Sequence, residues 1–231
     1  MQQSEQSLEW WQDIYDRGDI FWHLPSPHEY LVTYFNRRNA PKHPKVLIPL
    51  IGNTVDAKWL YDQGCEVTGV DMCEAPIKRL YGQHNIAYSH VQTTFPEFTM
   101  FHNQDHKIKV FLGNFYQFGM RVAETKFDFI WDRAAFTAIN IPDREKYVSV
   151  LKSVIAPKGN ILLIALNYDV DKYQGPPHYV THEDMDRLFG GYFSVKLLNK
   201  REVLQQWHKK DWGIDWLEES VYSLHLRDDA N

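Results

Sequence analysis

A glycine and an aspartate stand at the ends of two apolar runs, where a nucleotide could bind. Gly52 follows the run at 46–50, and Asp71 ends the next run at 67–70. A strand, a glycine turn, a helix and a second strand that ends in an acid form half of a nucleotide-binding unit, in which the acid accepts the ribose hydroxyls. Only one glycine lies within 45–61, so the glycines that a dinucleotide needs are missing. An ordinary packing unit with a loop glycine remains an alternative.

Asp132 and Arg133 directly follow a third apolar run, FDFIW, at 127–131. A guanidinium at a strand end can hold a substrate anion or polarise a ring nitrogen. The pair can equally form a structural ion pair, or Asp132 can orient Arg133. These residues alone leave the alternatives open.

Large rings crowd the N-terminal stretch, which includes Trp11, Phe21, Trp22 and His23. A small-molecule pocket needs a cover that excludes water, so this stretch fits a lid. A hydrophobic cover over the core explains the same rings. His23 and, near the other end of the chain, His208 are also candidate proton acceptors for a thiol.

Composition excludes several classes of protein. The chain has 231 residues, 44% of them hydrophobic, and a net charge of −5, so we expect one domain (1–231) that binds neither nucleic acid nor an anionic membrane. No apolar run reaches membrane-spanning length, no secretory signal is visible, and two cysteines fit a reduced cytoplasmic protein. His102 and His106 are spaced like a metal pair but have no third ligand nearby, so we expect no metal.

The order of elements predicts an α/β fold. Helices are expected at 7–17 and 28–38, and strands then alternate with helices from residue 46 onward, with an extra hairpin within 85–106. Alternation predicts a seven-stranded, mostly parallel sheet with helices on both faces and an antiparallel edge strand. In such sheets ligands bind at the carboxyl ends of the strands, so the loops there should converge.

Several segments, in order along nearly the whole chain, resemble the thiopurine S-methyltransferase family. They are EWWQDIYDRGDIFWH, VLIPLIGNTVDAKWL, FDFIWDRAAFTAINIPDR, LNYDVDKYQGPPHYV and WHKKDWGIDW. The resemblance implies a Rossmann-like class I methyltransferase, a cytoplasmic monomer that binds S-adenosyl-L-methionine and methylates the sulfur of a small thiol or thiopurine. It also implies that residues 1–40 form an N-terminal helical lid.

The resemblance assigns roles residue by residue. The cofactor would contact Trp11, Tyr15, Trp22, Leu50, Gly52, Asp71, Asn114, Phe115 and Arg133. The substrate would contact Trp22, His23, Arg133, Pro177 and Trp207, and the catalytic residues would be Arg133 and Asp132. Trp207 replaces an arginine of the mammalian members and Asp71 a glutamate, so thiopurines need not be the preferred substrates. A related methyltransferase for selenium, tellurium or halide species and a non-catalytic cofactor-binding protein remain alternatives.

Overall fold

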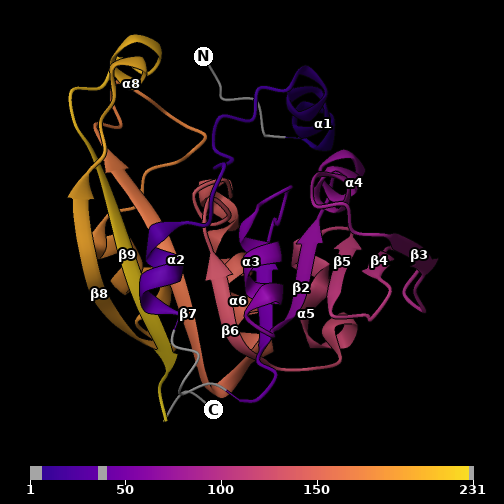
Figure 1. Cartoon of the computed structure of the whole chain (residues 1–231). Helices are drawn as coiled ribbons and strands as arrows, with labels where there is room; N and C mark the ends of the chain where they lie inside the picture. Colours follow the sequence, from indigo (N-terminus) through magenta and orange to yellow (C-terminus); the bar gives the residue numbers. More distant parts are fainter. Residues whose placement is uncertain (1–6, 36–40, 229–231) are drawn as a thin grey trace.

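The computed structural model describes residues 7–35 and 41–228. In these ranges a single sheet of nine strands has helices on both faces (Figure 1). The helices are α1 Leu8–Arg17, α2 Glu29–Tyr34, α3 Asp56–Asp62, α4 Glu74–Gln83, α5 Phe115–Ala123, α6 Arg144–Val154, α7 His182–Phe189 and α8 Gln206–Asp211. The strands are β1 Lys45–Pro49, β2 Glu66–Asp71, β3 Tyr88–Gln92, β4 Thr99–Asn103, β5 Ile108–Leu112, β6 Phe127–Asp132, β7 Ile155–Tyr168, β8 Phe193–Glu202 and β9 Leu217–Leu226.

The strands lie in the order β3-β4-β5-β2-β1-β6-β7-β9-β8. The five central strands, β5 to β7, pair in parallel, as the alternating pattern predicts. Strand β9 pairs antiparallel to both β7 and β8, and β4 pairs antiparallel to β3 and β5. Seven strands were too few, because the hairpin expected within 85–106 extends the main sheet instead of standing apart.

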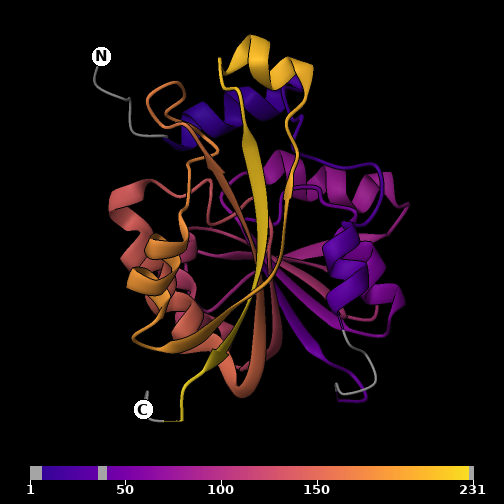
Figure 2. The same ribbon diagram turned by 90° about the vertical axis from the view of Figure 1, so that its left-hand side faces the viewer.

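Two apolar cores, one on each face, hold the helices to the sheet. Val122, Leu151 and Leu188 of α5, α6 and α7 lie in one core, whereas Leu31 and Leu60 of α2 and α3 lie in the other, together with α4. Figure 2 shows these two helical layers on opposite sides of the sheet. The parallel strands therefore end at an edge that neither layer covers, and α1 and α8 lie above it.

Residues 7–35 contribute one helix above the open edge of the sheet and one helix to a layer on its face. Ser7 caps α1 and Gly18 ends it in the left-handed conformation, both as predicted. Helix α2 ends at Tyr34, earlier than expected, and packs on the sheet face. Of the expected lid, residues 1–6 and 36–40 lie outside the described part of the chain, as does the end of the second predicted helix. Within the described ranges no helix is long and apolar enough to cross a membrane.

Candidate active site

A cavity of about 740 Å³ opens at the carboxyl ends of the parallel strands, under α1, α8 and the segment 18–24. Most of the residues assigned from the sequence line it. They are Trp11, Tyr15, Trp22, His23, Leu50, Asp71, Arg133, Pro177 and Trp207. Gly52, Asn114, Phe115 and Asp132 are not among its lining residues. The size is in the usual range for small-molecule sites, roughly 300–1,000 Å³.

Asp71 ends β2 and is only 6% exposed. One carboxylate oxygen accepts the amide hydrogen of Gly52 at 2.8 Å, and the other accepts that of Cys73 at 2.9 Å. Burial raises the pKa of this carboxyl to about 6, although the backbone hydrogen bonds act in the opposite direction. Each oxygen keeps a further lone pair, so the carboxylate can still accept hydroxyl groups from a ligand in the cavity.

The turn after β1 is fixed by Gly52. Its φ is +53°, and an added Cβ would lie 2.7 Å from Cε1 of His23 and 2.8 Å from the Tyr15 hydroxyl. Gly52 therefore acts by allowing the N-terminal segment to pack on this turn, and it does not itself line the cavity. Leu50 and Ala134, on the loops after β1 and β6, also have positive φ, at 45° and 63°. Such strained conformations concentrate at functional sites.

An aromatic roof covers the cavity. Trp22 lies 6.0 Å, ring centre to ring centre, from both Trp11 and Tyr15 of α1. Next to it Phe21 contacts Trp207 of α8 at 5.2 Å. The roof thus joins segments nearly two hundred residues apart in the sequence, and it lies where the lid interpretation expects a cover over the pocket.

His23 lies under this roof, against the turn after β1. Its Nε2 is 3.5 Å from the Tyr15 hydroxyl, and its Nδ1 is buried without a hydrogen-bond partner. Burial, followed by the charges of Arg133 and Arg79, lowers the pKa of His23 to about 4. The imidazole is therefore neutral at neutral pH, the state in which a histidine can accept a proton.

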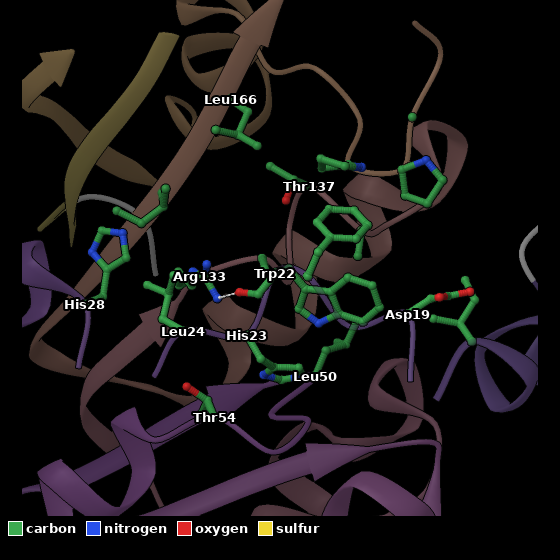
Figure 3. Close-up of a pocket in the computed structure, with 18 of the residues that line it drawn as sticks. Asp19, Trp22, His23, Leu24, His28, Leu50, Thr54, Arg133, Thr137 and Leu166 are labelled. Carbon is green, nitrogen blue, oxygen red and sulfur yellow. Dashed lines mark hydrogen bonds between the residues drawn. The ribbon is translucent and has the colours of Figure 1, made fainter. Parts of the chain in front are cut away.

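Arg133 extends from the end of β6 beneath Trp22. Its Nη1 donates a hydrogen bond to the Trp22 carbonyl, drawn as a dashed line in Figure 3. Burial lowers the pKa of the guanidinium, whereas the charges of Asp56 and Glu219 raise it. Arg133 thus links the roof to the sheet and brings a positive charge into a largely apolar cavity.

Asp132, the neighbour of Arg133, faces the core. It is fully buried, and its carboxylate accepts the amide hydrogen of Phe136 at 2.9 Å and the hydroxyl of Tyr147 at 2.7 Å. It therefore fixes the loop after β6 against α6. Its position outside the cavity does not fit the direct catalytic role assigned from the sequence, because side chains alternate along a strand and its successor Arg133 takes the cavity side.

Because the Asp132 carboxyl is buried, we expect its contribution to the free energy of unfolding to depend on pH. Burial raises the pKa of its carboxyl from 3.8 to about 6, so the folded state binds the proton more tightly than the unfolded state. Its contribution is full below pH 4 and is lost as the pH rises through about 6. Relative to Asp132→Asn, the wild type should lose about 2.5 kcal/mol of unfolding free energy between pH 4 and pH 7. Urea unfolding of both proteins at both pH values measures this, and an unchanged difference would contradict it.

Asn114 and Phe115, the pair expected to flank adenine, have other contacts. Asn114 is exposed, and its side chain caps α5 by accepting the amide hydrogen of Tyr116 at 2.9 Å. Phe115 is 6% exposed and packs in the core, with its ring 4.9 Å from that of Tyr147. Met72 and Cys73, which follow β2, line the cavity instead.

A charged group that lines the cavity was not assigned from the sequence. Its members are His28, Asp56, Arg201 and Glu219. Asp56 follows a glycine turn as a helix N-terminal acid would, and Glu219 lies in an apolar strand where a charged residue is out of pattern. Glu219 was therefore the residue by which the sequence could have indicated this group, because a charge at an inward strand position needs a partner.

The cavity's residues fit a sulfonium nucleoside. A carboxylate at the end of β2 lines the cavity, and an aromatic roof lies over it. Taken with the order of the strands and the position of the cavity at their carboxyl ends, these features define a class I S-adenosylmethionine-dependent methyltransferase.

Solved structures and sequence relatives agree with this class. The fold is similar to that of a Burkholderia thailandensis 1,6-didemethyltoxoflavin-N1-methyltransferase, with a TM-score of 0.63 at 13% identity over 94% of this chain and 87% of that one. TehB from Haemophilus influenzae gives a TM-score of 0.58 at 16% identity, covering 95% and 66%.

The family model for thiopurine S-methyltransferase matches residues 6–227. Thiopurine S-methyltransferase of Equus caballus is 33% identical over 218 residues, covering 94% of this chain and 88% of the relative. A probable thiopurine S-methyltransferase of Danio rerio is 33% identical over 216 residues, covering 93% and 92%. The chain belongs to the thiopurine S-methyltransferase family and is a methyltransferase that uses S-adenosylmethionine.

Proposed function

We propose that the protein transfers a methyl group to the sulfur of a small thiol or thiopurine-like acceptor. The observation that carries this proposal is one cavity that is lined by both Asp71 and Arg133 beneath an aromatic roof. Asp71 serves the cofactor, and Arg133 serves the acceptor. The bound cofactor supplies an electrophilic methyl group on a sulfonium.

The chain's own residues act by positioning and by excluding water, which supply most of the rate for a nucleophile as reactive as sulfur. Trp11, Tyr15 and Trp22 form the lid. Arg133 holds negative charge on the acceptor through charge-assisted hydrogen bonds. Neutral His23 is the candidate acceptor for a thiol proton. We do not propose a role at the reacting atoms for Asp132.

The acceptor side of the proposed site is aromatic. The rings of Trp207 and His208 lie with their centres 3.7 Å apart and their planes tilted by 34°. Trp207 also contacts Phe21, and Pro177 lies on the same cavity wall. This wall offers stacking surface where a second cation would be needed to bind an anionic purine. As part of the same proposal, the enzyme acts as a cytoplasmic monomer on a dissolved small molecule, which is what the family resemblance implies.

A panel of acceptors with methyl-labelled S-adenosylmethionine tests the proposal. Small uncharged thiols should be methylated, and 6-mercaptopurine should have a kcat/KM no higher than theirs, because Trp207 provides no charge for it. A large advantage for 6-mercaptopurine would contradict the interpretation of Trp207. If the label were transferred only to selenium, tellurium or halide acceptors, the proposal of a sulfur acceptor would be wrong. Cofactor binding without any turnover would indicate a non-catalytic protein.

A further inference from the structure

The charged residues that line the cavity are three arginines and four carboxylates. They are Arg17, Arg133, Arg201, Asp19, Asp56, Asp71 and Glu219. Arg17 and Asp19 pair with each other at 3.3 Å and are both more than half exposed. Asp71 has the proposed ribose role. Two arginines and two carboxylates therefore remain to set the charge around the acceptor.

Asp56 is locked in place as an acceptor. It is 3% exposed, and its two oxygens accept hydrogen bonds from the Trp131 indole at 2.8 Å and the His28 amide at 2.9 Å. Trp131 lies two residues before Arg133 on β6. These two hydrogen bonds hold the Asp56 carboxylate in one orientation at the cavity wall.

Glu219 is held from two sides. Its Oε2 lies 3.5 Å from Nε2 of His28, and its Oε1 accepts a bond from Arg201 at 2.7 Å. Nδ1 of His28 accepts the amide hydrogen of Tyr30, so Nε2 carries the ring proton and points it at Glu219. Burial works against ionisation, but His28 and Arg201 hold the pKa of the Glu219 carboxyl below its usual value.

The two arginines are accordingly already balanced. Arg201 pairs with Glu29 as well as with Glu219. Arg133 lies in the same cavity as Asp56 and Glu219, within the electrostatic influence of both. Figure 3 shows His28, which joins the two carboxylates, on the same side of the cavity as Arg133. An anionic group that entered here would face two fixed carboxylates together with Arg133.

We propose that Asp56 and Glu219 make this site selective for acceptors that carry no charge apart from the reacting sulfur. Asp56 and Glu219 together balance Arg133 and Arg201, so the hydrogen bonds of Arg133 remain available while the cavity has no surplus positive charge to attract a second anionic group. A carboxylate, sulfonate or phosphate on the acceptor is rejected, and an uncharged group of the same shape is accepted. An anionic group that leaves water for a site without surplus positive charge is not compensated for its lost hydration, and this is an effective source of specificity. This inference rests on the proposed sulfur methylation.

Two acceptors of equal size and shape isolate the charge. 4-(Mercaptomethyl)benzamide and 4-(mercaptomethyl)benzoate differ only in an amide against a carboxylate, and a methylene separates the thiol from the ring. For the wild-type enzyme the kcat/KM for the amide should exceed that for the carboxylate by about 100-fold. Comparing a ratio within each protein cancels any general loss of activity or of folded protein.

Glu219→Gln should reduce this preference to about tenfold, because one carboxylate fewer leaves the two arginines with a surplus positive charge that attracts the anionic acceptor. Glu218→Gln is the matched control: it is the neighbouring residue on β9, removes the same charge, pairs with Lys200 at 3.1 Å and is absent from the cavity lining. Its ratio should stay at the wild-type value.

An equal or greater kcat/KM for the carboxylate in the wild type would overturn the inference and leave sulfur methylation intact. A ratio that is unchanged in Glu219→Gln, or reduced equally in Glu218→Gln, would overturn the role of Glu219. Failure to methylate either thiol, or the simple benzyl thiol run beside them, would instead overturn the proposed function and the inference with it.

Discussion

Replacing Asp71 with alanine should weaken the binding of S-adenosylmethionine by at least about 100-fold. Two charge-assisted hydrogen bonds from ribose hydroxyls are worth roughly 1.5–3 kcal/mol each, and the alanine removes both. It also removes the acceptor for the Gly52 and Cys73 amides, which hold the loops after β1 and β2 together. Calorimetric titration with S-adenosylmethionine and with S-adenosylhomocysteine measures the dissociation constants directly.

Asp71→Glu is the matched control, since it keeps the carboxylate on a side chain that is one methylene longer. It should retain binding within about tenfold. If Asp71→Ala bound the cofactor as tightly as the wild type while remaining folded, the ribose assignment would be wrong.

Arg133→Met should reduce kcat/KM for a thiol acceptor by roughly 100- to 1,000-fold, the usual cost of removing one preorganised donor. Methionine keeps much of the side-chain volume but loses both the charge and the bond to the Trp22 carbonyl, so part of the loss should appear as a less well closed roof. Steady-state kinetics with varied acceptor measures the effect.

Arg133→Lys separates charge from shape, because lysine keeps the charge but lacks the planar fork. The kcat/KM of Arg133→Lys should lie between that of the wild type and that of Arg133→Met. If the kinetic constants of Arg133→Met stayed within threefold of the wild type, Arg133 would be a structural residue only.

Much of the fold could be predicted because its signals are local. Ser7 and Gly18 bound α1, Thr181 forms a capping box at α7, and alternating apolar runs set the parallel core. The number of strands was less certain, because the hairpin β3–β4 is largely polar: all five residues of β3 are exposed, so nothing in its pattern shows that it joins the main sheet.

The site could be predicted where function depends on a strand end. Asp71, Leu50 and Arg133 lie at such ends and line the cavity. Asp132 and Asn114 also lie at strand ends or just beyond them, but their orientation is decided by tertiary partners, Tyr147 for one and the first turn of α5 for the other. The pairing of His28 with Glu219 spans almost the whole chain, so no local pattern contains it.

The most direct test of the central claim locates the transferred methyl group on an acceptor with competing nucleophiles. The enzyme is incubated with trideuteromethyl-labelled S-adenosylmethionine and 4-(mercaptomethyl)aniline, and the product is fragmented in a mass spectrometer. We predict that the label is on sulfur and that Arg133→Met forms the same product at least about 100-fold more slowly. Label on the amine, or no labelled product from the folded, cofactor-bound enzyme, would contradict the assignment of this cavity to sulfur methylation.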